Sequence, residues 1–123
     1  MNVDWSFHFE EQFQRIIATI VQAQSYEDGI EWHERIGGQI SLLANFPLMG
    51  DNVPARCFTQ PPDDLERLRQ LIISPYRVVY EIVGEQCRLL AIVRSSSMLV
   101  RNELLWDKQP DSFVIRGDAV ADK

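Results

Sequence analysis

Two apolar segments joined by a two-residue link constrain the fold of this chain more than any other feature. The segments are Tyr76–Val83 and Gln86–Val93, and the link between them is Gly84-Glu85. Glycine at the first position of a two-residue link is typical of a tight β-hairpin. Leu68–Ile73, just before this pair, predicts a third strand, so we expect an antiparallel sheet.

The turn also predicts which hairpin residues share a face of the sheet. With Val83 opposite Gln86, one face is entirely apolar or aromatic, and we expect it to pack against helices. That face holds Tyr76, Val78, Tyr80, Ile82, Cys87, Leu89, Ala91 and Val93. The opposite face pairs Glu81 with Arg88, Val79 with Leu90 and Arg77 with Ile92, and Arg94 lies one step beyond Ile92.

The strand that precedes the hairpin leaves two registers open. A three-residue link after Ile73 places Arg69 opposite Val79, on the same face as Arg77, whereas the alternative register buries Arg69. Proline at the second central position disfavours a two-residue primed turn, because a type I′ turn needs a positive φ there. We therefore expect the three-residue link.

The N-terminal third predicts one strand and two helices. Val3–Phe9 alternates apolar and polar residues with the period of a half-buried strand. From Glu10 the apolar residues recur at helical spacing, and Ser25 followed by Asp28 predicts the capped start of a second helix. Two helices with so short a connection form an antiparallel hairpin. Close packing on the first helix would explain Gly37-Gly38 inside the second.

The remaining segments are less regular. Asn45–Asp64 contains four prolines and is long for a loop, and long ordered loops often bind something. Met98–Trp106 predicts a short helix capped by Ser97. Further on, Ser112–Arg116 is a candidate for one more short strand.

Composition and charge limit the classes of function. The 123 residues fit one compact domain, and a net charge of −6 disfavours nucleic acid as the main ligand unless basic residues gather on one face. Two cysteines, Cys57 and Cys87, and two histidines are too few for a zinc site, so we expect no metal and no cofactor. No apolar stretch reaches the ~20 residues of a membrane span and no secretory signal is visible, so we expect a cytoplasmic protein without a membrane partner.

The order of these elements and several short motifs resemble the RelE/ParE toxins of type II toxin–antitoxin systems, and most closely the ParE-like branch. Phe46-Pro47 with Gly50 is similar to that family's Leu-x-x-Phe-Pro-x-x-Gly element, Leu68-Arg69 to its Leu-Arg strand start, and residues 76–80 to its Tyr-Arg-x-x-Tyr strand. The second-helix pattern is matched by Gly29, Trp32, Ile36, Ile40 and Leu43.

The resemblance implies an α+β fold in which an antiparallel sheet of about four strands packs on an N-terminal helical hairpin. The implied order is β-α-α-β-β-β followed by a short C-terminal helix, within a toxin domain of residues 1–106. Residues 107–123 would then form an extension that is partly disordered or adds a short strand.

The resemblance also implies a cytoplasmic toxin of a plasmid-stabilisation system, neutralised by a cognate antitoxin. ParE-like members inhibit DNA gyrase, whereas RelE-like members cleave messenger RNA on the ribosome. RNA cleavage needs a general acid and base, but Arg94-Ser95-Ser96-Ser97 follows the last strand and Trp106 cannot transfer protons. We therefore favour inhibition of a protein target and name no catalytic residue. A ribonuclease relying on Arg69, Arg77 and Arg94, and a non-toxic relative that binds antitoxin alone, remain the alternatives.

The expected functional face is the one that the helices leave uncovered. Its basic and apolar residues form a patch that a lone monomer would rarely expose. We expect an antitoxin segment to cover the patch and to pair its carboxylates with the arginines, with homodimerisation as the competing explanation. The candidate residues are Arg69, Arg77, Val79, Leu90, Ile92 and Arg94.

Overall fold

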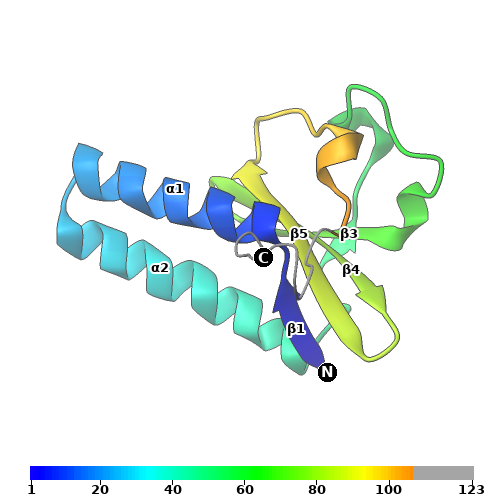
Figure 1. Cartoon of the computed structure of the whole chain (residues 1–123), viewed down its shortest axis with the longest axis horizontal. Helices are drawn as coiled ribbons and strands as arrows, with labels where there is room; N and C mark the ends of the chain where they lie inside the picture. Colours follow the sequence, from blue (N-terminus) through cyan, green and yellow to red (C-terminus); the bar gives the residue numbers. More distant parts are fainter. Residues whose placement is uncertain (107–123) are drawn as a thin grey trace, which may run out of the picture.

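A computed structural model describes residues 1–106, in which a helical hairpin packs on one face of a five-stranded sheet (Figure 1). The helices and strands are β1 (Asn2–Trp5), α1 (Phe7–Ala23), α2 (Tyr26–Ser41), β2 (Asp51–Asn52), β3 (Leu68–Ile73), β4 (Tyr76–Val83) and β5 (Gln86–Arg94). Four short 3-10 helices lie between or after them: η1 (Leu42–Ala44), η2 (Ala55–Cys57), η3 (Leu65–Arg67) and η4 (Arg101–Glu103). The α+β prediction and its element order are confirmed. The candidate strand at Ser112–Arg116 lies outside the described residues.

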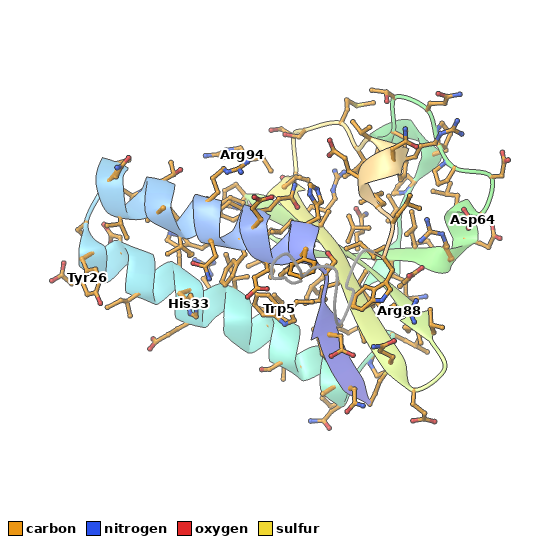
Figure 2. All side chains as sticks on the ribbon, in the orientation of Figure 1. Trp5, Tyr26, His33, Asp64, Arg88 and Arg94 are labelled. Carbon is orange, nitrogen blue, oxygen red and sulfur yellow. The ribbon has the colours of Figure 1, made fainter. Side chains whose placement is uncertain are left out.

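The strands of the sheet have the order β1-β5-β4-β3-β2. β1 runs parallel to β5, and the other neighbours are antiparallel. β2 is a two-residue strand inside the predicted loop Asn45–Asp64, so that loop adds an edge to the sheet. Tyr26, at the start of α2, and Asp64, in the long loop, lie at opposite ends of the molecule (Figure 2). Within residues 1–106, no helix is both long and apolar enough to cross a membrane.

The first helix begins three residues earlier than the sequence pattern predicted. Ser6 caps α1, because its hydroxyl accepts the N–H of Phe9 at 3.0 Å. The predicted strand Val3–Phe9 therefore ends at Trp5, and Phe9 joins Phe13 on the buried face of the helix. Aromatic residues at positions 5, 7 and 9 imitate a strand period, but the buried N-cap decides the boundary.

The second helix confirms its predicted cap and corrects the explanation of its glycines. The Ser25 hydroxyl accepts the N–H of Asp28 at 3.0 Å. A methyl group added at Gly37 or Gly38 would meet nothing within 4 Å, so close packing on α1 does not account for them. Gly29 is the glycine at the helix contact, because a β-carbon there would overlap Cγ2 of Val21.

The β4–β5 hairpin follows the predicted register for half of its length. The pairs from Val83–Gln86 to Tyr80–Leu89 are as expected, but a register shift then leaves Leu90 without an opposite residue. Val79 consequently faces Ala91. Because a one-residue shift reverses the faces of all later residues, Ile92 joins the helix-side core and Ala91 the opposite one.

The register predicted for β3 is wrong. Ile73 pairs with Tyr76 across a two-residue link, and the Ser74–Pro75 peptide bond is cis, as in a type VI turn. Arg69 therefore lies opposite Tyr80, and the alternative register is the correct one. A cis proline allows the two-residue link that a primed turn with proline at its second central position does not.

The face of the sheet opposite the helices is not open. We call it the loop face, and the face under α1 and α2 the helix face. On the loop face, Val79 and Leu90 are fully buried beneath the chain's own residues 53–65 and 98–106. The prediction of an exposed apolar patch on this face is therefore wrong. The covering apolar residues include Val53, Phe58, Leu99 and Leu104.

The segment expected to form the C-terminal helix instead covers the loop face with little regular structure. Leu99 makes a parallel bridge with Phe58, and η4 is the helical turn within Met98–Trp106. Ser97 does not cap it, because the turn starts after Val100 without a side-chain cap. The bridge at Leu99 and the single turn η4 bury Leu99 and Leu104 against the loop face.

Charged residues hold this cover in place. The carboxylate of Glu81 accepts from Arg67 Nη1 at 2.7 Å, and Arg67 Nη2 also donates to the carbonyl of Leu104 at 3.3 Å. The predicted partner Arg88 does lie opposite Glu81, but its closest approach is 3.9 Å. Its guanidinium stacks instead on Trp106, 4.9 Å from the ring centre. Sequence reasoning missed Arg67 as the main partner of Glu81.

Candidate functional site

The structure divides the six predicted site residues among three places. Arg77, Val79 and Leu90 lie on the covered loop face, whereas Ile92 and Arg94 lie toward α1. Arg69 lies on the helix face, next to the loop that follows α2. The predicted continuous face of arginines and apolar residues does not exist, because the shift at Leu90 and the two-residue link each reverse part of it.

Arg77 is an internal structural residue in this conformation. Its side chain is 7% exposed, and Nη2 donates to the carbonyl of Ser95 at 2.7 Å. Its Nε and Nη1 atoms have no hydrogen-bond partner within residues 1–106. Arg77 therefore holds the turn after β5, and a carboxylate from another chain would reach it only if that turn moved.

Arg69 and Tyr80 hold the loop Phe46–Gly50. Arg69 Nη2 donates to the carbonyls of Leu48 and Gly50 at 3.2 and 2.6 Å. The Tyr80 hydroxyl donates to the carbonyl of Pro47 at 2.7 Å and accepts the N–H of Gly50 at 3.1 Å. Burial raises the pKa of Tyr80 above its usual value, so the hydroxyl keeps its proton. Tyr80 is a core residue, as predicted.

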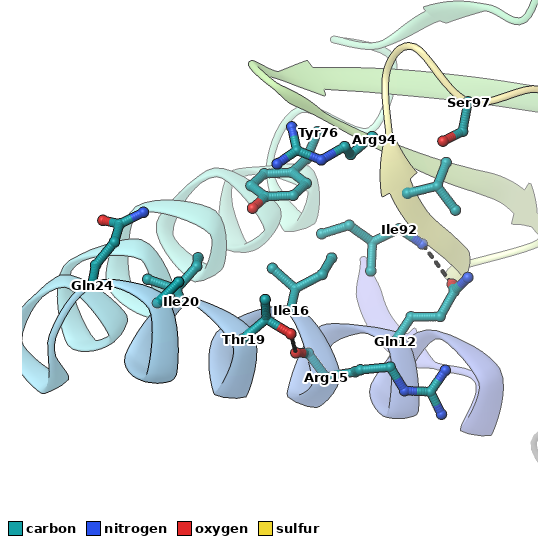
Figure 3. A pocket seen from close by; sticks show the side chains of 12 residues that line it. Gln12, Arg15, Ile16, Thr19, Ile20, Gln24, Tyr76, Ile92, Arg94 and Ser97 are labelled. Carbon is teal, nitrogen blue, oxygen red and sulfur yellow. Dashed lines mark hydrogen bonds between the residues drawn. The ribbon is translucent and has the colours of Figure 1, made fainter.

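A groove lies between α1 and β5. Its volume is about 480 Å³. From α1 it is lined by Gln12, Arg15, Ile16, Thr19, Ile20, Ala23 and Gln24, and from the sheet and the following turn by Tyr76, Ile92, Val93, Arg94 and Ser97 (Figure 3). Of the predicted site residues, it brings together Ile92 and Arg94.

The groove combines an apolar floor with a cationic rim. Ile16, Ile20 and Ile92 line it, and Arg94 lies over the ring of Tyr76 at 5.7 Å (Figure 3). Arg94 is exposed and has no carboxylate partner among residues 1–106. Arg15 is also exposed, and its pair with Glu11 is 3.9 Å long between two largely solvated side chains, which contributes little. Both arginines are therefore available to an anionic group.

The groove also contains the edge of β5. β1 pairs with β5 as far as Leu89, and beyond it α1 takes the place of a neighbouring strand. The Ser6 hydroxyl donates to the carbonyl of Leu90 at 3.3 Å. Gln12 Oε1 accepts the N–H of Ile92 at 2.9 Å (Figure 3). Side chains at the start of α1 therefore satisfy the backbone of β5 at these two positions, where a neighbouring strand would otherwise pair.

Sequence reasoning missed the α1 contribution to this groove. Gln12, Ile16, Thr19 and Ala23 recur at helical spacing along one side of α1, which is a readable signal. Their place beside β5 was not readable, because it depends on how the helix crosses the sheet.

A model of one protein family matches most of this chain. The family is described as ParE toxin of type II toxin-antitoxin system, parDE, and the match covers residues 3–99. This chain belongs to the ParE toxin family. The resemblance to the RelE/ParE toxins, and to their ParE-like branch in particular, is thereby confirmed.

A solved structure of the chromosomal ParDE toxin–antitoxin system from P. aeruginosa has a similar fold. The TM-score is 0.61 at 18% sequence identity, and the alignment covers 76% of this chain and 95% of that chain. No curated protein sequence matches this chain.

The structure explains the motifs of this ParE-family chain. In the Tyr-Arg-x-x-Tyr strand, Tyr76 lines the groove, Arg77 holds the turn after β5, and Tyr80 holds the Phe-Pro-x-x-Gly loop. Gly50 must be glycine, because a β-carbon there would lie 2.5 Å from the carbonyl oxygen of Gln70 and 2.7 Å from the Tyr80 hydroxyl. Packing therefore accounts for these motif residues.

Proposed function

We propose that this chain is the toxin of a type II toxin–antitoxin pair, that it acts in the cytoplasm by binding and inhibiting a protein target, and that this target is DNA gyrase. A toxin of this kind, with its antitoxin, would stabilise the plasmid or locus that encodes the pair. Membership of the ParE family supports the toxin assignment. The α1–β5 groove is the observation that supports neutralisation by an antitoxin.

The groove suits a segment of an antitoxin chain. Its α1 wall runs from Gln12 to Gln24, about 18 Å at the rise of an α-helix, which accommodates a strand of five or six residues or three helical turns. The apolar floor would bury the apolar side of such a segment, and Arg15 and Arg94 would pair with its carboxylates. We propose this groove, in place of the loop face, as the antitoxin site.

The distribution of the arginines supports a binding toxin over a ribonuclease. Arg69, Arg77 and Arg94 lie in three separate environments, and two of them are occupied in holding backbone carbonyls. Cleavage of RNA requires groups that remove and donate protons at one scissile bond. The two histidines of the sequence lie on α1 and α2, and His33 packs against the ring of Phe13 at 5.0 Å.

Induction of this chain in bacteria, without the neighbouring gene, tests the toxin half of the proposal. We expect growth to stop with filamentation and a DNA-damage response while protein synthesis continues, and we expect the purified chain to inhibit supercoiling by gyrase. An immediate stop in translation, with messenger cleaved at defined codon positions, would establish the ribonuclease instead. Normal growth with a folded chain would identify a non-toxic relative.

Charge reversal in the groove tests the antitoxin half. Arg15→Glu with Arg94→Glu should weaken binding to the product of the neighbouring gene by about tenfold for each arginine, because each loses a charge-assisted pair. Arg35→Glu with Arg56→Glu changes the net charge equally at two exposed arginines outside the groove. If the two double variants bind equally well, the groove is not the site.

A further inference from the structure

A second concave surface lies between α1 and α2, at a separate place from the groove beside β5. Its volume is about 290 Å³, and most of its lining is apolar. Tyr26, beside the α1–α2 turn, is 68% exposed (Figure 2), and Ile30, one turn further along α2, is 42% exposed. We call this surface the helix cleft. It is lined by Ile17 and Val21 of α1 and by Tyr26, Gly29, Ile30, His33 and Glu34 of α2.

Two glycines continue the helix cleft along α2. Gly37 follows His33 by one helical turn and Gly38 follows Glu34 by one turn, so both extend the surface that these lining residues form. Glycine disfavours a helix interior relative to alanine, yet a β-carbon at either position would meet nothing within 4 Å. A residue type that breaks a local preference without a packing role inside the fold is expected at functional sites. Here it leaves the backbone of α2 bare for close approach by another chain.

The outer rim of the helix cleft is acidic. Glu27, Glu31 and Glu34 follow one another at four- and three-residue spacing along α2, and like charges at this spacing disfavour a helix. All three are exposed, and none has an ion-pair partner among residues 1–106.

The acidic rim belongs to a wider separation of charge. The two helices together hold six acidic residues and two arginines, whereas the rest of residues 1–106 holds eight acidic residues and seven arginines. Most of the net negative charge in this part of the chain therefore lies on the helical hairpin. A partner that binds there gains from carrying positive charge.

These features specify the chemistry of an occupant. Together, the lined part of α2 and the two glycines extend from Tyr26 to Gly38, about 18 Å at the rise of an α-helix, which about three turns of another helix match. Small residues at a helix crossing allow the two axes to approach closely. The apolar side of such a helix would cover Tyr26 and Ile30, and its lysines or arginines would face the glutamates. The occupant that fits is a basic amphipathic helix.

The position of the helix cleft favours the antitoxin as the source of this helix. Ile16 and Ile20 line the α1–β5 groove, whereas their neighbours Ile17 and Val21 line the helix cleft. The two concave surfaces therefore flank α1, which is about 10–12 Å across with its side chains. A chain that fills the groove needs only about four extended residues to cross α1 and reach the cleft. A second copy of this chain fits less well, because two acidic hairpins repel each other.

We propose that the helix cleft is a second contact site for the antitoxin, and that a basic amphipathic helix of that chain occupies it. The inference rests on the proposed function, which supplies the antitoxin as a partner. It deepens that function, because the antitoxin then grips α1 from both sides. An acidic part of the antitoxin meets Arg15 and Arg94 in the groove, and a basic part meets the glutamates of α2.

The test measures the Kd of the purified full chain for the product of the neighbouring gene, by calorimetry at about 0.1 M salt. Glu31→Lys with Glu34→Lys reverses the acidic rim. Glu66→Lys with Glu85→Lys makes the same change of net charge at two exposed glutamates that line neither concave surface. We expect the rim variant to bind about tenfold more weakly and the control variant to bind as the wild type does.

A second variant tests the bare backbone of α2. Gly37→Gln with Gly38→Gln adds β-carbons that meet nothing in the free chain, so it should raise the melting temperature. In the complex the added side chains would overlap the antitoxin helix, and we expect binding to weaken by about tenfold or more. Lost binding in a variant that is more stable than the wild type does not come from unfolding. Growth arrest without the neighbouring gene should persist in both cleft variants, since the cleft has no part in target binding.

The outcomes separate this inference from the proposed function. If both cleft variants bind the neighbouring gene product as the wild type does, the inference is overturned, while the groove is still judged by its own charge reversal at Arg15 and Arg94. Equal weakening in the Glu66→Lys, Glu85→Lys control would overturn it as well, because net charge alone would explain the effect.

Two further outcomes would assign the cleft to another occupant and so overturn the inference. One is normal antitoxin binding with loss of growth arrest in the cleft variants, which would assign the cleft to the target. The other is a wild-type dimer, seen by light scattering, that the cleft variants dissociate, which would assign it to a second copy. A wild-type chain that arrests growth but does not bind the neighbouring gene product would overturn the inference and the antitoxin half of the proposed function together, and would leave the toxin half standing.

Discussion

The helix face and the loop face of the sheet are both closed, but by different means. On the helix face, α1 and α2 place apolar stripes over Val78, Tyr80 and Leu89, and the core is apolar and aromatic. On the loop face, irregular segments cover Val79 and Leu90, and they are held by charged groups that include Glu81 and Arg77. Regular elements bury surface by periodic side chains, whereas irregular ones have free carbonyls that need donors from side chains. The stability of the loop face should therefore depend on specific polar pairs, and that of the helix face on the volume of its buried side chains.

The largest effect should come from emptying the helix-side core. Phe13 is almost fully buried and packs against Trp5 with ring centres 5.4 Å apart. Phe13→Ala should lower the free energy of unfolding by about 3–5 kcal/mol, through lost burial and a residual cavity. Urea unfolding measures this, and Phe46→Ala is the control, with a change below about 0.5 kcal/mol because its ring is already mostly in solvent. Equal losses would contradict the packing described.

The two cysteines allow the pH dependence of stability to be compared for the two faces. Burial raises the pKa of the Cys87 thiol on the helix face from 9.0 to about 11. The folded state therefore favours the neutral thiol, so this stability is complete below about pH 9 and is lost as pH rises through about 11. The loss should reach about 2–3 kcal/mol, from 1.36 kcal/mol per pKa unit.

Unfolding by urea between about pH 8 and pH 11 checks this in the wild type and in Cys87→Ala. The variant should lose less stability over that range, and Cys57→Ala, at a half-buried cysteine beside the loop face, is the control for removing a thiol elsewhere. Burial also raises the pKa of Tyr80, and because the Cys87 thiolate adds to this shift, its removal in Cys87→Ala acts in the same direction. Parallel curves for the wild type and Cys87→Ala would show that the thiol does not contribute.

On the loop face, the ion pair between Arg67 and Glu81 should contribute measurably to the free energy of unfolding. Glu81→Gln keeps the shape of the side chain but removes the charge that Arg67 meets at 2.7 Å. Because Arg67 is one quarter exposed and also pairs with Asp64, the loss should be about 2 kcal/mol, below the range for a fully buried pair. Thermal unfolding measures it. Glu11→Gln, in an exposed pair, should change stability by less than about 0.5 kcal/mol.

The smallest effects should distinguish two glycines of α2. Gly38→Ala should raise stability by about 0.5–1 kcal/mol, because the helix gains propensity and the new methyl group meets nothing within 4 Å. Gly29→Ala should lower stability by about 1 kcal/mol or more, since the methyl group would overlap Val21 of α1. Circular dichroism during thermal unfolding compares them. The same sign for both would mean that α1 and α2 do not approach most closely at Gly29.

Much of the fold was predictable because its signals are local. The glycine turn at Gly84 has a positive φ of 60°, and it determines the register of the four pairs next to it. Ser25 identifies the start of α2, and the bounds of β3 and β4 agree with the predicted segments. Of the candidate site residues, Ile92 and Arg94 line the groove, on the face of the sheet opposite to the predicted one, and their part in binding stays a prediction.

The sequence by itself therefore determined the α+β class, the ParE-type order of elements, the bounds of β3 and β4 and the start of α2, since these depend on turns, caps and periodicity within a few residues. The tertiary structure alone decided the shift at Leu90, the burial of Arg77 and the closure of the loop face. It also decided that α1 would replace a strand beside β5 and so create the groove. These features arise from contacts between segments far apart in the chain, where packing of the whole outweighs any local preference.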